Sequence, residues 1–235
     1  MTAVCYTPFK IPRVRVTTLS NCGVAVTGSC ATVVSDGIIS IAMTKEYEPR
    51  QEFFVKNGNG DFCVKETNPP ILKWVNLVLT FCNVDPEMVN IITANPNYLD
   101  DLTAGARKTG YSEEEGSAAN VNFALEGWTR LSNTGIACTG GTEYGYVLFP
   151  WVVEGTVGDI TFQNDTVSFV VNARTRGASQ WGTGPYNIDL SDATGTLNNP
   201  IRMLTPIGSL QHYRMFTTRL APPTSACGCV PLFSL

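Results

Sequence analysis

The chain has 235 residues, of which 43% are hydrophobic, so it is long and apolar enough to bury a substantial core. Only 15% of the residues are charged, against about 25% in an ordinary soluble domain, which favours a surface that is partly covered by other protein. The net charge of -4 excludes the basic field that tight nucleic-acid binding needs.

The sequence contains no run near the ~18 consecutive apolar residues that cross a bilayer. The first sixteen residues carry charges and prolines where a signal peptide would have its apolar region, so we expect folding in a cytoplasm. In such a reducing compartment the eight dilute cysteines are predicted to be buried free thiols, above all Cys63 and Cys82, which lie in apolar strand patterns.

The first elements in chain order are predicted to be strands of an antiparallel meander, because their residues are mostly β-branched or aromatic. The turn residues of Asn57–Asp61 join two of them as a hairpin, so the segment 44–70 is expected to be one long hairpin. The four strands are expected over Gly37–Thr44, Gln51–Lys56, Phe62–Lys65 and Ile71–Phe81.

A short helix is predicted next. Asp85 is a good N-cap, Pro86 suits the first helical position, and Pro96 ends the pattern. The apolar residues expected on one face, packed on a sheet, are Val84, Met88, Ile91 and Ile92.

A polar loop is expected over Leu102–Asn120, after which the β pattern returns. The last of these segments alternates, with apolar residues on one face and Ser168, Asn172, Arg174 and Arg176 on the other; a turn is expected at Gln163–Thr166. The predicted fold is mainly β (α+β): an antiparallel β-sandwich or partial barrel with one flanking short helix. The strands are expected over Val121–Leu131, Glu143–Gly155, Val157–Gln163 and Thr166–Arg176.

Motifs for catalysis, cofactors and metals are weak. His212 is the only histidine and is predicted to make a structural hydrogen bond in a strand. Cys227 and Cys229 have one residue between them, too few for a zinc knuckle, and Tyr111 stands where a phosphate-binding loop needs lysine. We therefore expect no enzyme activity, no cofactor and no metal.

Three motifs, "FCNVDPEMVNIIT", "LEGWTR" and "WGTGPY", occur in this order within a longer pattern from about Thr17 to Cys229. With them the chain resembles the major tail, or tail tube, proteins of long-tailed phages with non-contractile tails, most like those of actinobacterial phages. The resemblance implies a structural virion protein, assembled in the host bacterial cytoplasm, whose stacked, hexameric rings form the conduit for DNA ejection.

The resemblance also implies partners. They are copies of the same chain, other tail proteins at the tube ends, and DNA only transiently and non-specifically in the lumen, with no membrane. Strands of neighbouring subunits join edge to edge in this family, which removes open sheet edges. Asn172, Arg174 and Arg176 would then face the lumen or a neighbouring subunit.

Two segments are expected to make the contacts between subunits. Residues 1–221 form a single domain whose hairpin at about 44–70 reaches the next ring through Glu46, Tyr47, Glu48 and Arg50. Residues 222–235 form a carboxyl-terminal arm beyond two prolines. Its apolar side chains dock on a neighbouring subunit or, as the alternative, the arm folds back on its own domain. These side chains are Val230, Leu232, Phe233 and Leu235.

Two other classes of function stay open. In a carbohydrate-binding or receptor-binding β-sandwich, tryptophans in the strands would act as stacking platforms. In a β-rich hydrolase, a pair of carboxylates distant in the sequence would act on a substrate. The tryptophans concerned are Trp74, Trp128, Trp151 and Trp181.

Overall fold

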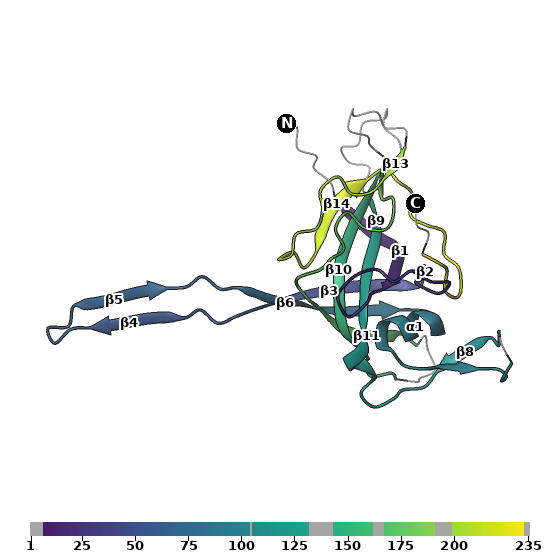
Figure 1. Cartoon of the computed structure of the whole chain (residues 1–235), viewed down its shortest axis with the longest axis horizontal. Helices are drawn as coiled ribbons and strands as arrows, with labels where there is room; N and C mark the ends of the chain where they lie inside the picture. Colours follow the sequence, from purple (N-terminus) through teal and green to yellow (C-terminus); the bar gives the residue numbers. More distant parts are fainter. Residues whose placement is uncertain (1–6, 104, 132–142, 162–166, 191–198, 233–235) are drawn as a thin grey trace.

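The computed structural model describes residues 7–103, 105–131, 143–161, 167–190 and 199–232. It is mainly antiparallel β-structure with one short α-helix beside the sheet, which confirms the predicted fold class (Figure 1). The strands are β1 (Pro8–Thr18), β2 (Thr32–Ser35), β3 (Ile38–Tyr47), β4 (Glu52–Lys56), β5 (Phe62–Thr67), β6 (Leu72–Phe81), β7 (Asn97–Leu99), β8 (Lys108–Tyr111), β9 (Asn122–Leu131), β10 (Tyr144–Val157), β11 (Phe169–Thr175), β12 (Asp189–Leu190), β13 (Pro200–Ile201) and β14 (Arg214–Thr218). The helix α1 spans Pro86–Thr93, and a 3-10 turn spans Ser117–Asn120.

The main sheet has the order β2-β1-β9-β10-β11-β6-β3, with β14 paired to β10. The long strand β10 changes neighbours along its length: Tyr144–Leu148 pair with β14, whereas the half that begins at Val152 pairs with β11. Bulges accompany this change, since the β10 registers with β9 and β11 both shift near Val153. Bulges bend a strand, and here β9 and β10 cross the direction of β3 and β6 (Figure 1).

Two apolar clusters lie on opposite sides of the central strands β9 and β10. Phe123 and Leu125 of β9 face the first cluster, which also receives the buried face of α1. Ala124 and Trp128 of β9 face the second cluster, which is rich in aromatic residues. A strand buried on both faces reads as a near-continuous apolar run, which is why β9 and β10 were each predicted as strands from the sequence.

Helix α1 begins as predicted. The Asp85 side chain accepts a hydrogen bond from the backbone N–H of Glu87 (3.0 Å), and Pro86 is the first helical residue. Met88 and Ile92 are buried, but Val84 is 48% exposed. The prediction for Val84 was wrong because this residue precedes the cap and lies outside the helix.

The segment that the sequence predicts as a long hairpin leaves the sheet and forms a projecting arm (Figure 1). Strands β3 and β6 pair with each other inside the main sheet, and beyond them β4 and β5 form a separate two-stranded ladder. Every residue of β4 and β5 is exposed. We call the β4–β5 ladder with its Asn57–Asp61 turn the arm.

The structure corrects several other predictions. Cys63 and Cys82 are exposed, because β5 belongs to the arm and Cys82 lies in the turn after β6. The expected loop Leu102–Asn120 contains β8, and β1 was not predicted. A strand at Val157–Gln163 is not present, since β10 ends at Val157 and the described residues that follow, 158–161, form none. The turn expected at Gln163–Thr166 lies outside the described residues.

Candidate functional site

The strongest candidate for a functional surface is the arm. Val55 lies opposite Val64 and Phe53 opposite Glu66, and residues that are opposite in an antiparallel ladder share a face. This face is therefore mainly apolar. Phe53 is 50% exposed, Val55 54% and Val64 42%, so it has no covering in the single chain.

The other face of the arm carries aromatic rings with lysines. The rings of Phe54 and Phe62 lie 5.8 Å apart between centroids. The ammonium groups of Lys56 and Lys65 lie 4.8 and 6.0 Å from the Phe62 ring, within reach of a cation–π interaction. Both faces of the ladder thus present large apolar side chains to solvent, which a monomeric protein seldom does.

The arm is held by local bonds at its tip and by continuous strands at its base. The Asn57 side chain accepts hydrogen bonds from the backbone N–H groups of Asn59 and Asp61 (3.0 and 2.9 Å). At the base, the N–H of Glu48 donates to the carbonyl of Ile71 (2.8 Å), and β3 and β6 continue the ladder into the main sheet. The arm is therefore an extension of the fold and not a loose loop.

The residues predicted to contact the next ring lie at this base. Glu46 and Tyr47 end β3, while Glu48 and Arg50 lie in the link to β4; all four are exposed. Arg50 makes only a long ion pair with Glu52, 4.0 Å from nitrogen to oxygen. These four residues therefore lie beside the arm, and their contact with another ring stays a prediction; the apolar side chains of the ladder beyond were not among the predicted contact residues.

The two edges of the main sheet differ. Within the described residues β3 pairs only with β6, so its outer edge is open, and its Ile39 and Met43 are 52% and 44% exposed. At the other edge, the carboxyl-terminal segment covers β2: Val230 exchanges backbone hydrogen bonds with Thr32 (2.7 and 3.1 Å). An open edge is a template for pairing with another chain.

The carboxyl-terminal arm therefore lies on its own domain in the single chain, as in the alternative interpretation. Val230 is half-buried in its bridge to β2, and Leu232 packs against the aromatic cluster. Cys229 is joined to Cys30 by a disulfide, which the prediction of free thiols excluded. Phe233 and Leu235 lie outside the described residues.

The predicted lumen or interface residues lie in the second half of β11 and directly after it. Asn172 is exposed, and Arg174 makes an ion pair with Glu154 and lies over the Trp74 ring at 4.8 Å. Arg176 lies over the Trp151 ring at 4.6 Å. Both arginines line one open cavity of about 510 Å³, which Lys73 also lines. The structure brings the two arginines together but leaves Asn172 outside this cavity.

A buried polar network, which was not predicted from the sequence, crosses β1, β9 and β10. The Arg15 guanidinium donates two hydrogen bonds to the Glu126 carboxylate (2.6 and 2.7 Å), and the Tyr146 hydroxyl donates a third (2.5 Å). Burial opposes the charge on Arg15, but Glu126 outweighs it and raises the pKa of Arg15. Burial also raises the pKa of Tyr186, whose ring lies 3.4 Å from the guanidinium, to about 12.

This network has the properties of a structural element. The Glu126 side chain is fully buried and its oxygens are satisfied by Arg15 and Tyr146. The paired charges therefore link β1, β9 and β10 in the interior of the fold.

His212 has the structural hydrogen bond that the sequence predicted, although it precedes β14 instead of lying in a strand. Its Nδ1 is 2.8 Å from the hydroxyl of Thr175, which also accepts a hydrogen bond from the N–H of Val75 (2.9 Å). Burial lowers the pKa of His212. The Thr175 hydroxyl thus links the imidazole to the backbone of β6, and His212 is part of the packing between β6 and β11.

The tryptophans do not form an exposed stacking surface. Trp128, Trp151 and Trp181 are 2%, 4% and 6% exposed and belong to the aromatic cluster, while Trp74 is half-buried. Three of the four candidate platforms for a sugar are thus core residues.

Comparisons with known proteins add no name to this arrangement: no family model matches the sequence, and no curated protein matches it. None of the described helices is long and apolar enough to cross a membrane.

Proposed function

We propose that this protein is a structural subunit of a phage tail tube, which assembles into stacked rings around the conduit for DNA ejection. The observation that supports the proposal best is the arm: a ladder that leaves the domain, with large apolar residues exposed on both faces. The sequence resemblance to tail tube proteins supplies the kind of assembly, including six subunits per ring.

An arm of this kind is poorly stable as a free structure. A two-stranded ladder is marginal in water, and each fully buried Phe or Val side chain is worth about 1.5–3 kcal/mol at best. The arm has five such side chains that remain about half exposed: Phe53, Phe54, Val55, Phe62 and Val64. Burial of these side chains against another copy supplies the missing stabilisation, so the arm serves contacts between rings.

The open edge of β3 supports contacts within a ring. Pairing of this edge with a different edge of the next copy is a head-to-tail contact, which closes into a ring when the rotation between copies allows it. The exposed Ile39 and Met43 would be covered by such a neighbour. The net charge of -4 fits a conduit that DNA passes through without holding.

The test is electron microscopy of the purified full chain, with sedimentation velocity to follow assembly. The arm variant carries Phe54→Glu and Phe62→Glu, which place charges on one face. A matched control carries Leu210→Glu, because Leu210 is 90% exposed and lies outside the arm. We expect rings or tubes from the natural chain and from the control, and folded subunits that do not stack from the arm variant.

Two outcomes contradict the proposal. One is a natural chain that stays a compact monomer at high concentration. The other is an arm variant that forms tubes of normal length. A monomer that binds glycans would instead favour the carbohydrate-binding class.

A further inference from the structure

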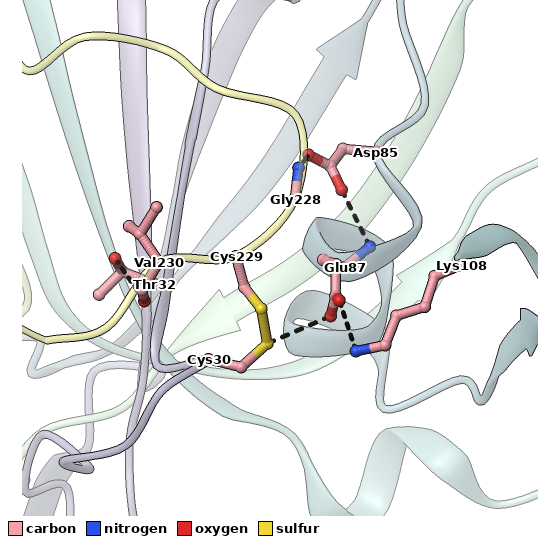
Figure 2. Close-up of a disulfide and its surroundings, with 8 residues drawn as sticks. All are labelled: Cys30, Thr32, Asp85, Glu87, Lys108, Gly228, Cys229 and Val230. Carbon is pink, nitrogen blue, oxygen red and sulfur yellow. Dashed lines mark hydrogen bonds and ion pairs between the residues drawn. A yellow bond between two sulfur atoms is a disulfide. The ribbon is translucent and has the colours of Figure 1, made fainter. Parts of the chain in front are cut away.

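Three segments that are far apart in the sequence meet at one end of helix α1 (Figure 2). Cys30 precedes β2, Glu87 lies in the first turn of α1, and Cys229 belongs to the carboxyl-terminal arm. The two sulfurs and a carboxylate oxygen of Glu87 all lie within 4.8 Å of one another. In this structure the sulfurs form a disulfide across 199 positions of sequence.

The Glu87 carboxylate has one satisfied oxygen and one that faces sulfur. Its Oε1 accepts an ion pair from Lys108, and its Oε2 lies 3.3 Å from the Cys30 sulfur (Figure 2). A thiol can donate a proton across that distance, but a disulfide sulfur has none to donate. The carboxylate is therefore placed for the reduced pair, with a proton or a cation between oxygen and sulfur.

The donor set identifies the cation. Two thiolates and one carboxylate, with water in the fourth position, are ligands that Zn²⁺ takes in a tetrahedral site. Ca²⁺ and Mg²⁺ prefer sites made only of oxygen atoms. Sulfurs bound to a tetrahedral zinc lie about 3.7 Å apart, given Zn–S bonds of about 2.3 Å, so the metal and the disulfide exclude each other.

We infer that the reduced protein binds one Zn²⁺ through the sulfurs of Cys30 and Cys229 and the carboxylate of Glu87, and that oxidation closes the same site as a disulfide. A thiol reductant breaks the sulfur–sulfur bond by exchange: the disulfide takes up two electrons and two protons, and the reductant becomes a disulfide. Zn²⁺ then displaces the two thiol protons.

The site joins the carboxyl-terminal arm to the domain in both redox states. A hydrogen bond also holds the carboxyl-terminal arm here: the N–H of Gly228 donates to the side chain of Asp85 (2.7 Å), the N-cap of α1 (Figure 2). In a reducing cytoplasm the metal would replace the covalent link. This inference concerns the single chain, so it stands or falls separately from tube assembly.

The test uses the full chain, reduced with a phosphine that does not bind metals, and titrated with Co²⁺ as a coloured substitute for zinc. We expect one Co²⁺ per chain with a thiolate-to-cobalt absorption band, displaced by Zn²⁺. Cys30→Ser and Cys229→Ser should each abolish the band, and Glu87→Gln should weaken binding by about tenfold or more. Cys22→Ser and Cys227→Ser are matched controls that should bind as the natural chain does.

The oxidised natural chain gives a second measurement that does not depend on any variant. It should bind no Co²⁺ and should regain binding after reduction. Absence of the band in the reduced chain, or a band that persists in Cys229→Ser, overturns the inference. Loss of the band in Cys227→Ser also overturns it, because that result assigns the ligands differently.

Discussion

Two hairpins of this protein both carry large apolar side chains but have opposite surroundings. β9–β10 and β4–β5 are both antiparallel ladders. Phe123 and Phe149 of the first are fully buried, whereas Phe53 and Phe54 of the second are 50% and 46% exposed. The first hairpin is stabilised by residues of its own chain on both faces, and the second has no such layer.

The difference shows that an apolar β pattern in a sequence predicts a strand but does not show whether the same chain buries its apolar side chains. The apolar side chains of β9 and β10 are buried by α1, β1 and the aromatic cluster. Those of the arm are exposed in the single chain. We therefore expect substitutions in β9–β10 to change folding and substitutions in the arm to change assembly.

The largest change in stability is expected from the buried ion pair between β1 and β9 of the main sheet. Glu126→Ala leaves the Arg15 guanidinium buried without its partner and should lower the free energy of unfolding by about 3–5 kcal/mol. The matched change in the arm, Glu52→Ala, removes an exposed pair with Arg50 and should cost about 0–1 kcal/mol. Urea denaturation of both variants measures the difference, and similar losses would contradict it.

Phenylalanine substitutions compare the two hairpins directly. Phe123→Ala opens a cavity in the core and should lower the free energy of unfolding by about 3–5 kcal/mol. Phe54→Ala should change it by no more than about 0.5 kcal/mol, because the ring is half exposed in the single chain. In sedimentation experiments the order should reverse, with Phe54→Ala assembling less. An arm variant that unfolds as easily as the core variant would refute this division.

The carboxyl-terminal arm is a third region, which is partly exposed but is held to the domain by the Cys30–Cys229 disulfide. Loss of its disulfide in Cys229→Ser should lower the free energy of unfolding by about 2–4 kcal/mol, measured without reductant or metal. Cys227→Ser, at an exposed free thiol two residues earlier, should leave the denaturation midpoint unchanged. Equal midpoints for both variants would mean that the link does not stabilise the fold.

The smallest expected effect is a pH dependence of stability, which comes from His212 and does not involve the arm. Burial lowers the pKa of His212 in the folded chain, so below about pH 6.5 the unfolded chain takes up a proton more readily than the folded one. Stability should therefore fall as the pH drops from about 7 to 5. The fall should be smaller in His212→Gln, because His212 is the only histidine. Identical pH profiles for the two chains would exclude this contribution.

Much of the fold was predictable because it rests on local patterns. The cap and first proline of α1, and the apolar runs of β9 and β10, predicted their elements correctly. β1 was missed because Pro8, Pro12 and two arginines interrupt its pattern, although Arg15 is buried against Glu126. Partners separated by 111 positions leave no periodic signal.

The candidate surfaces were only partly predictable for the same reason. The hairpin at 44–70 and its exposed, charged base could be recognised from the sequence, but the exposure of the apolar side chains of β4 and β5 could not, and Cys63 was wrongly assigned to a core. The pairing of Cys30 with Cys229 next to Glu87 depends on the path of the whole chain. The low density of cysteines and the expected reducing compartment favoured free thiols, and two cysteines 199 positions apart leave no local pattern that would indicate their pairing.

Because of the way the arm joins the domain, the length of the arm can change without affecting the folding of the domain. Its strands continue β3 and β6, whose own ladder lies within the main sheet, so a change of length near the Asn57–Asp61 turn leaves that ladder intact. Each added cross-strand pair lengthens the arm by about 3.4 Å. The length of the arm can therefore change in small, regular steps, with no compensating change in the core.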